Sequence, residues 1–268
     1  IIYNGEAFNY VELKPELLQK GHRFTTATDT EVLLHLYEEY GPACLEKING
    51  QFSLAIWENR KKELFLARDR MGIRPLFYTQ SGSRLLFASE IKALFTHPEV
   101  PRAIDAEALH QVFTFWTTLA GGTIFEGIHE LPPGHYMTVT DGRITRKAFW
   151  TLPYYAPEDR WQGSFPEACE ALHDLLLDAV RIRLRADVPV GAYLSGGLDS
   201  SLITALIARN FNNRLKTFSI GFQEGAFDES RYQQQMIAHL QTDHRRTLAS
   251  NPLIREHFAD LVWHCEKP

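Results

Sequence analysis

A short polar run in the second half of the chain holds the residues best suited to chemistry. Ser195, Gly196, Gly197, Asp199 and Ser200 follow an apolar stretch and precede a stretch with helical periodicity. Adjacent glycines let the backbone approach a phosphate group, and the first turn of a helix offers unpaired N–H donors. The aspartate could hold a magnesium ion that bridges phosphate oxygens. A serine-capped helix without a ligand is the alternative, but this loop has more polar groups than a cap needs. We therefore predict a phosphate site.

The absence of one residue type helps to identify the kind of phosphate loop. The lysine of the common Gly-x4-Gly-Lys-Ser/Thr loop is absent. The run instead resembles the pyrophosphate loop of enzymes that cleave ATP between its α and β phosphates. That resemblance implies ATP as substrate, with Asp199 contacting Mg²⁺ through the pyrophosphate.

The elements that position this loop alternate regularly. After a helix opened by the capping box Ser164-x-x-Glu167, the pattern predicts a strand at 188–194, a helix at 200–210, a strand at 216–222 and a helix at 229–240. Such alternation predicts a parallel sheet with right-handed crossovers, in which ligands bind at the carboxyl ends of the strands. The loop lies at such an end.

The first half predicts a different architecture. Closely spaced strand-like runs favour antiparallel pairing; they are 52–57, 64–67, 75–78, 85–88, 135–139 and 144–149. Asn4-Gly5 predicts a tight turn that ends an opening strand. Thr28-x-x-Glu31 predicts a capping box, and Pro15 predicts a helix that begins near Lys14. We expect domains at 1–153 and 164–268, joined by a linker at 154–163.

The bulk composition excludes several classes of protein. The chain has 268 residues, 44% of them hydrophobic, and a net charge of −5, which gives no reason to expect a nucleic-acid or membrane partner. The sequence contains no apolar run of membrane-spanning length, and we expect no secretory signal. Three widely spaced cysteines fit a reducing compartment, so we expect the cytoplasm and neither disulfides nor a zinc site. The eleven histidines form no recognised metal motif.

Five motifs of the first half occur in a characteristic order. They are Asn4-Gly5-Glu6, Thr28-Asp29-Thr30-Glu31-Val32, Arg68 to Leu76, Ala88 to Leu94, and Leu131-Pro132-Pro133-Gly134-His135. Together they resemble the glutaminase domain of glutamine-dependent asparagine synthetases, and the 195–200 loop lies where that family has its synthetase domain. The resemblance implies an α+β N-terminal-nucleophile (class II glutamine amidotransferase) domain, followed by an α/β Rossmann-like ATP-pyrophosphatase domain. We expect both to be truncated, in a fragment of a longer protein.

The resemblance also implies residue roles. The Asn4 side chain and the Gly5 N–H would form the oxyanion hole for glutamine hydrolysis, and Glu6 and Asp29 would join them in binding glutamine by holding its α-amino group. Leu194 and Ile220 would lie against the adenosine. ATP binding is assigned to Leu194, Ser195, Gly196, Gly197, Leu198, Asp199, Ser200 and Ile220.

The implied reaction joins two sites. Glutamine hydrolysis would supply ammonia to an ATP-adenylated aspartate, giving asparagine, AMP and pyrophosphate. The family's nucleophilic N-terminal cysteine is not in this chain, and we expect Cys44 to be a buried structural thiol rather than its substitute, so the isolated chain is expected to be inactive. A carboxylate adenylation like that of β-lactam synthetases and a non-catalytic nucleotide- or amino-acid-binding module are the alternatives. A homodimer is the assembly considered.

Overall fold

The computed structural model describes residues 1–119, 121–211, 214–223 and 229–266. Contacts divide the chain into two units, one formed by Ile1–Tyr154 with Val262–Pro268 and the other by Tyr155–Leu261. Among the described residues, no helix is both long enough and apolar enough to cross a bilayer.

The first unit is built around an antiparallel five-stranded sheet in the order β1-β2-β3-β7-β8. Its strands are β1 (Ile2–Ala7), β2 (Gly50–Glu58), β3 (Glu63–Arg68), β7 (His135–Thr140) and β8 (Arg143–Ala148). The predicted antiparallel pairing is confirmed here. Within the described residues β1 pairs with β2 alone, so it forms one edge of the sheet.

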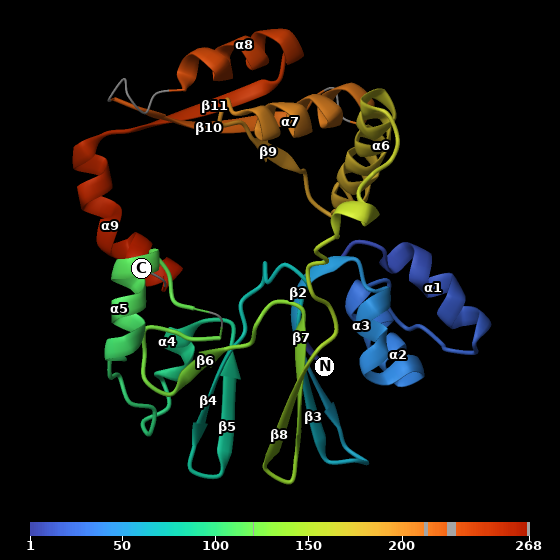
Figure 1. Cartoon of the computed structure of the whole chain (residues 1–268), viewed down its shortest axis with the longest axis vertical. Coiled ribbons are helices and arrows are strands. Elements are labelled where there is room, and N and C mark those ends of the chain that lie inside the picture. The colour runs from blue at the N-terminus through green and yellow to red at the C-terminus, as the bar shows by residue number, and fades with distance from the viewer. Residues whose placement is uncertain (120, 212–213, 224–228, 267–268) are drawn as a thin grey trace. The chain divides into compact units, whose positions relative to one another are not determined.

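Apolar side chains alternate between the two faces of this sheet. On one face, Phe52, Leu54 and Phe65 pack against Leu17 and Leu36 of the helices drawn in blue in Figure 1. These helices are α1 (Tyr10–Gln19), α2 (Asp29–Tyr40) and α3 (Cys44–Lys47), with a 3₁₀ turn η1 (Gly41–Ala43) between the last two. The sheet thus carries a helical layer on one side.

The opposite face carries a second, smaller sheet. Ala55, Leu66 and Met137 pack there against Leu76 and Leu131. The small sheet has the order β5-β4-β6 and is antiparallel. Its strands are β4 (Phe77–Ser81), β5 (Arg84–Ala88) and β6 (Ile128–Glu130), and the helices α4 (Ile91–Leu94) and α5 (Ala106–Phe115) accompany it. The unit is therefore layered helix, sheet, sheet.

The turn expected at Asn4-Gly5 is not formed, and that prediction is wrong. Strand β1 continues through both residues to Ala7, in register with β2. A Cβ on Gly5 would lie 2.2 Å from the Gln51 carbonyl oxygen. The glycine therefore permits a close approach of two strands, and pairing overrides the local turn preference.

The expected start of the first helix is also corrected. Helix α1 begins at Tyr10, not near Lys14, and contains Pro15. The proline leaves the Val11 carbonyl without its helical donor, but Val11 is exposed to water, while Leu13 and Leu17 bury the other face. Packing of that face keeps the helix continuous.

The capping box predicted at Thr28 is only half formed. Thr28 Oγ1 accepts from the Glu31 N–H at 3.4 Å. The Glu31 carboxylate accepts from Thr26 and Thr25 instead of returning to Thr28. Hydrogen bonds from Thr26 and Thr25 lower the pKa of Glu31 to about 2. The box predicted at Ser164 is complete, with both reciprocal bonds present.

A buried carboxylate shapes the loop after β3. Asp69 is 1% exposed and accepts four backbone N–H groups. They come from Phe52, Met71, Ile73 and Arg74, at 3.0–3.1 Å. The quoted Arg68–Leu76 motif therefore fixes a loop against the sheet.

The second unit contains the parallel sheet predicted from the alternation, in the order β11-β10-β9. Its strands are β9 (Gly191–Tyr193), β10 (Lys216–Phe222) and β11 (Asp243–Ala249). Its helices are α6 (Phe165–Arg183), α7 (Leu198–Asn210), α8 (Ser230–Leu240) and the first part of α9 (Asn251–Cys265), which passes into the first unit at Val262; a 3₁₀ turn η2 (Pro157–Asp159) precedes them. Val180 of α6, Ile207 of α7 and Leu215 form its core.

Candidate active sites

The free edge of β1 presents a backbone donor at Gly5. Gly5 lies opposite Phe52. The Phe52 N–H donates to Asp69 Oδ2 at 3.1 Å, and the Phe52 carbonyl accepts from the Asp69 N–H at 2.8 Å. A residue in an antiparallel strand directs both groups to the same neighbour, so Phe52 and Gly5 form a non-hydrogen-bonded pair. The Gly5 N–H is consequently directed away from β2, toward the open edge.

The same edge holds Asp29, the first residue of α2. Ala7 lies two residues beyond Gly5 and therefore directs its N–H to the same side. It donates to Asp29 Oδ2 at 3.0 Å, and the Tyr3 hydroxyl donates to the same oxygen at 3.1 Å. The fold thus brings Asp29 from a different element to the strand that carries Asn4, Gly5 and Glu6.

The carboxylates of Asp29 and Glu6 both lie near the Tyr3 hydroxyl. Burial and the Asp29 carboxylate, with a smaller contribution from Glu6, raise the pKa of Tyr3 above its ordinary value. The phenol therefore stays protonated and remains a donor to Asp29. Both carboxylates act on one phenol, and a pair of nearby carboxylates suits a cationic ligand group such as an ammonium.

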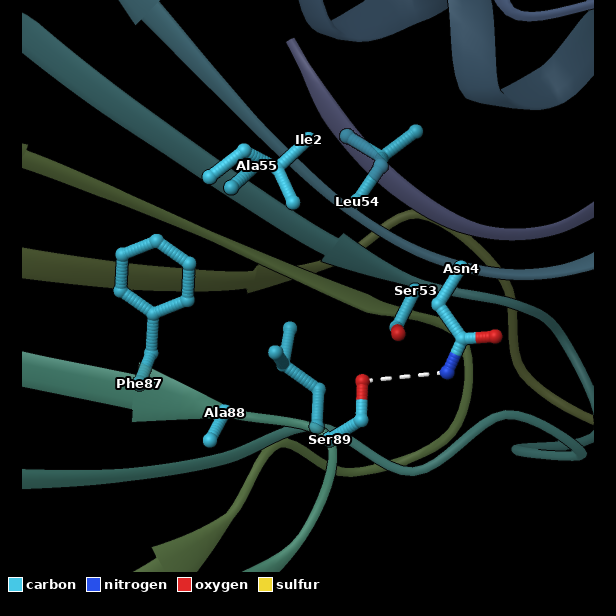
Figure 2. A pocket seen from close by; sticks show the side chains of 9 residues that line it. Ile2, Asn4, Ser53, Leu54, Ala55, Phe87, Ala88 and Ser89 are labelled. Carbon is cyan, nitrogen blue, oxygen red and sulfur yellow. Dashed lines mark hydrogen bonds between the residues drawn. The ribbon is translucent and has the colours of Figure 1, made fainter. Parts of the chain in front are cut away.

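The side chain of Asn4 lies on the face of β1 that is turned toward the smaller sheet, and it points into a cavity between the two sheets (Figure 2). Its Nδ2 donates to Ser89 Oγ at 3.0 Å. An amide nitrogen carries two protons, so this bond orients the group while using one of them. The cavity is lined by Ile2, Asn4, Ser53, Leu54, Ala55, Leu76, Phe87, Ala88 and Ser89. Ser89 lies in a quoted motif, yet its pairing with Asn4, 85 positions away, has no local sequence signal.

Cys44 is not a nucleophile in this arrangement. It opens α3 and is 2% exposed. Burial raises the pKa of its thiol to about 12. A thiol in this state holds almost no thiolate at neutral pH. The prediction of a buried structural thiol is confirmed.

In the second unit, the two serines of the predicted phosphate loop bond to each other. Ser195 Oγ and Ser200 Oγ are 2.9 Å apart, and Ser195 Oγ also accepts the Gly197 N–H at 3.2 Å. Gly197 is the N-cap of α7, and with no side chain it leaves the first turn of the helix uncapped. These bonds close the loop onto the start of a thirteen-residue helix.

Gly196 and Gln233 fix the path of this loop. Gly196 has φ +95°, and a Cβ on it would lie 3.1 Å from the Glu229 carbonyl oxygen, so a side chain there would be strained and crowded. Gln233 of α8 is 3% exposed and donates through Nε2 to the carbonyls of Ser195 and Ile220, at 3.0 and 3.2 Å. No motif or spacing in the sequence points to this role for Gln233.

The remaining residues assigned to ATP differ in accessibility. Leu194 is fully buried, and its N–H donates to the Phe218 carbonyl. Leu198 and Ile220 are exposed, and Asp199 is exposed in the first turn of α7. An uncapped helix start, two glycines and an accessible carboxylate are groups that can bind a magnesium-bound polyphosphate.

Two known protein families match successive parts of the chain. Residues 1–150 match the glutamine amidotransferase domain, and residues 171–268 match asparagine synthase.

Curated relatives match along the whole chain. It is 37% identical to asparagine synthetase [glutamine-hydrolyzing] 3 of Bacillus subtilis, over 98% of this chain and 44% of that protein. It is 34% identical to a putative asparagine synthetase [glutamine-hydrolyzing] 2 of Methanocaldococcus jannaschii, over 100% and 52%. It is 30% identical to amidase chry2 of Gibberella zeae, over 100% and 41%. The chain thus spans about half the length of these relatives, or less.

Proposed function

Because the chain belongs to the glutamine amidotransferase domain family through residues 1–150, we propose that the whole protein is a glutamine-hydrolysing asparagine synthetase. Glutamine and water would give glutamate and ammonia in the first domain. In the second, the aspartate side-chain carboxylate would attack the α-phosphorus of ATP and release pyrophosphate. Ammonia would then displace AMP to give asparagine.

The observation that carries the first half of this proposal is the convergence at the edge of β1. The Gly5 N–H and the Asn4 amide would donate to the oxyanion that develops on the glutamine side-chain carbonyl. Asp29, held by Tyr3 and Ala7, would bind the α-amino group together with Glu6. The nucleophile would be the family's N-terminal cysteine, which is not among the 268 residues of this sequence.

The second half of the proposal depends on the loop before α7. Ser195, Gly196, Gly197 and Ser200 would bind the pyrophosphate that leaves in the adenylation step, and the exposed side chain of Ile220 would contact the adenosine. Leu194, the other residue expected there, is fully buried and would only support the loop from within the fold. Asp199 would hold the magnesium ion, which when bound supplies charge neutralisation to the departing group. The finer fold assignment proposed for this domain is Rossmann-like ATP pyrophosphatase, with domain limits at 1–153 and 164–268.

The matches favour this function over the two alternatives. The relatives from B. subtilis and M. jannaschii are both described as glutamine-hydrolysing. A β-lactam-forming enzyme would not need the donors and carboxylates gathered on β1. We further propose a cytoplasmic location, which suits three cysteines with no disulfide framework, and a homodimeric assembly.

The test is carried out on the full-length protein, with asparagine and pyrophosphate measured separately. Asn4→Ala should lower glutamine-dependent synthesis by about 10²–10³-fold while synthesis from added ammonia persists, because one oxyanion donor is lost. Asp199→Asn should abolish pyrophosphate release with either nitrogen source.

The matched control is Asp174→Asn, whose carboxylate is exposed on α6 with its side chain 76% accessible. It should retain both activities. Unchanged pyrophosphate release in Asp199→Asn, or equal losses with glutamine and ammonia in Asn4→Ala, would contradict the proposal.

A further inference from the structure

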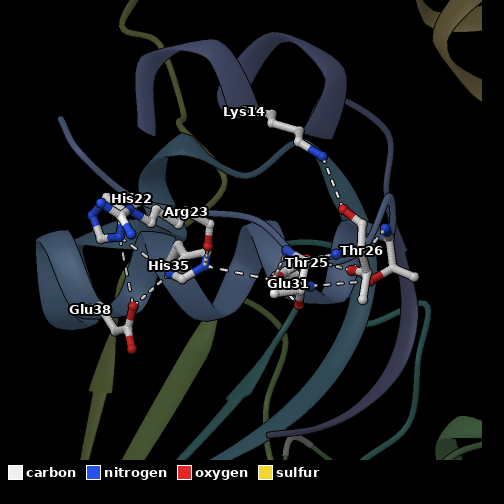
Figure 3. A network of polar contacts seen from close by, with 9 residues as sticks. Lys14, His22, Arg23, Thr25, Thr26, Glu31, His35 and Glu38 are labelled. Atoms are coloured by element: carbon white, nitrogen blue, oxygen red, sulfur yellow. Dashed lines mark hydrogen bonds and ion pairs between the residues drawn. The ribbon is translucent and has the colours of Figure 1, made fainter. Parts of the chain in front are cut away.

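Two histidines of the first unit face each other beside the helical layer (Figure 3). His22 lies between α1 and α2, and His35 lies within α2. Both are largely buried, with side chains 15% and 16% exposed. Their Nδ1 atoms are 3.2 Å apart. This pair was not evident from the sequence because the two residues are separated by a loop and two turns of helix.

The Nε2 atom of each ring already has a hydrogen-bond partner. His35 Nε2 lies 3.1 Å from the Arg23 carbonyl oxygen, and His22 Nε2 lies 3.2 Å from Glu39 Oε2. Carbonyl and carboxylate oxygens can only accept, so each Nε2 carries a proton. In a neutral ring the Nδ1 atom then carries a lone pair. Two neutral rings would face each other with lone pairs at 3.2 Å, an arrangement that a bridging cation, either a metal ion or a proton on one Nδ1, would stabilise.

A carboxylate completes the cluster. Glu38 Oε2 is 2.6 Å from His35 Nδ1 and 3.7 Å from His22 Nδ1. All three atoms lie within 4.8 Å of one another. Ligands that are each about 2.0–2.1 Å from a tetrahedral zinc ion lie about 3.3 Å apart. The side chain of Glu38 is 54% exposed, so its carboxylate has room to move by the roughly 0.7 Å that separates 2.6 Å from about 3.3 Å.

The surroundings match those of a metal site. Metal-bound histidines usually donate their second ring N–H to a carboxylate or a backbone carbonyl, which fixes the tautomer and the ring orientation. Glu39 and the Arg23 carbonyl occupy these positions. A pair of imidazoles with one carboxylate suits zinc and neighbouring transition metals, and not magnesium or calcium, which prefer oxygen ligands.

We propose that His22 Nδ1, His35 Nδ1 and Glu38 Oε2 bind a divalent transition metal ion of the zinc class, with water as the fourth ligand. The ion would join the segment after α1 to the middle of α2. That segment leads through Thr25 and Thr26 to Asp29, so a bound ion would stiffen the approach to the first candidate site.

The test uses Co²⁺ as a spectroscopic probe on the full-length protein after chelator treatment. The exposed thiols of Cys169 and Cys265 are replaced by serine in all samples, since they are competing ligands. We expect a visible d–d band of tetrahedral cobalt that saturates at one equivalent and is displaced by Zn²⁺. At a hundredfold excess over Kd, Zn²⁺ should raise the Tm of the first unit by about 5 °C, and Mg²⁺ should not.

Variants separate this site from other ligands. His35→Gln should remove the band, while His110→Gln, an exposed histidine on α5, should keep it. Glu39→Gln retains all three ligands and should weaken the affinity by about 10–100-fold, a test that does not depend on the folding of the His35 variant. A band that is absent from the parent protein, or that persists in His35→Gln at full affinity, would overturn the proposal and leave a proton as the bridging cation.

Discussion

Tyr3 and Asp29 are joined by a hydrogen bond of 3.1 Å from the phenol to Oδ2, which fixes the first residue of α2 against the edge strand of the sheet. The same oxygen accepts the Ala7 N–H, so two donors from β1 determine where the carboxylate lies. Oδ1 is contacted by Thr30 Oγ1 at 3.4 Å.

Tyr3→Phe should raise the KM for glutamine by about five- to tenfold with a smaller change in kcat, because a donor worth about 1 kcal/mol is lost from the carboxylate that would bind the α-amino group. Steady-state glutaminase kinetics of the full-length protein measure this. Tyr40→Phe, which removes a tyrosine–carboxylate bond to Glu16 on the helical layer, is the control and should leave KM unchanged. A KM equal to that of the parent would show that Ala7 alone positions Asp29.

Ser89 acts as a positioning residue for Asn4. Ser89→Ala should lower kcat for glutamine hydrolysis about five- to tenfold at nearly constant KM, because the amide loses the acceptor that orients it. Ser89→Thr keeps the hydroxyl and should restore most of the rate. Ser53→Ala alters the same cavity without touching this bond and serves as the control. Equal losses in the Ser53 and Ser89 variants would assign the effect to packing.

Cys44 should resist alkylation in the folded protein. At pH 8 a thiol with a pKa of about 12 holds very little thiolate, and its burial also blocks access. Iodoacetamide labelling followed by peptide mass spectrometry should find Cys169 modified and Cys44 unmodified, with Cys44 labelled only after denaturation. Rapid labelling of Cys44 under native conditions would place it outside the core.

Glu31 should contribute a pH-dependent part of the stability. Its pKa falls from 4.5 to about 2 on folding, so the charged form is favoured in the folded state. The contribution is complete above the unfolded pKa and is lost as the pH falls from about 4.5 toward 2. The Tm difference between the parent and Glu31→Gln should therefore shrink over that range. Glu170→Gln, at an exposed position of α6, should give no such trend.

The sequence predicted features that depend on local pattern. Short strand-like runs predicted the strands around Phe52 and Leu66, and the regular alternation of strands and helices predicted the parallel sheet to which β9 and β10 belong. The capping box at Ser164 formed because its partners lie three residues apart. Strand β11 was missed because Asp243–Ala249 is rich in charged residues and shows little apolar alternation.

Features that depend on distant pairing could not be predicted. Pro15 and the Asn4-Gly5 pair follow the packing of α1 and β1 against the sheet rather than their own preferences. Glu31 has several donors within hydrogen-bond reach, and only the path of the preceding loop selects Thr25 and Thr26. Gln233 reaches Ser195 across 38 positions, and no spacing rule links them.

The carboxylate of Asp69 gathers the N–H groups of Phe52, Met71, Ile73 and Arg74 at one buried point. These four amide protons come from two separate segments, yet none can exchange with solvent until the same side chain releases it. Hydrogen–deuterium exchange at the four should therefore follow a single shared opening rate. The loop and the neighbouring strand would then open as one cooperative unit.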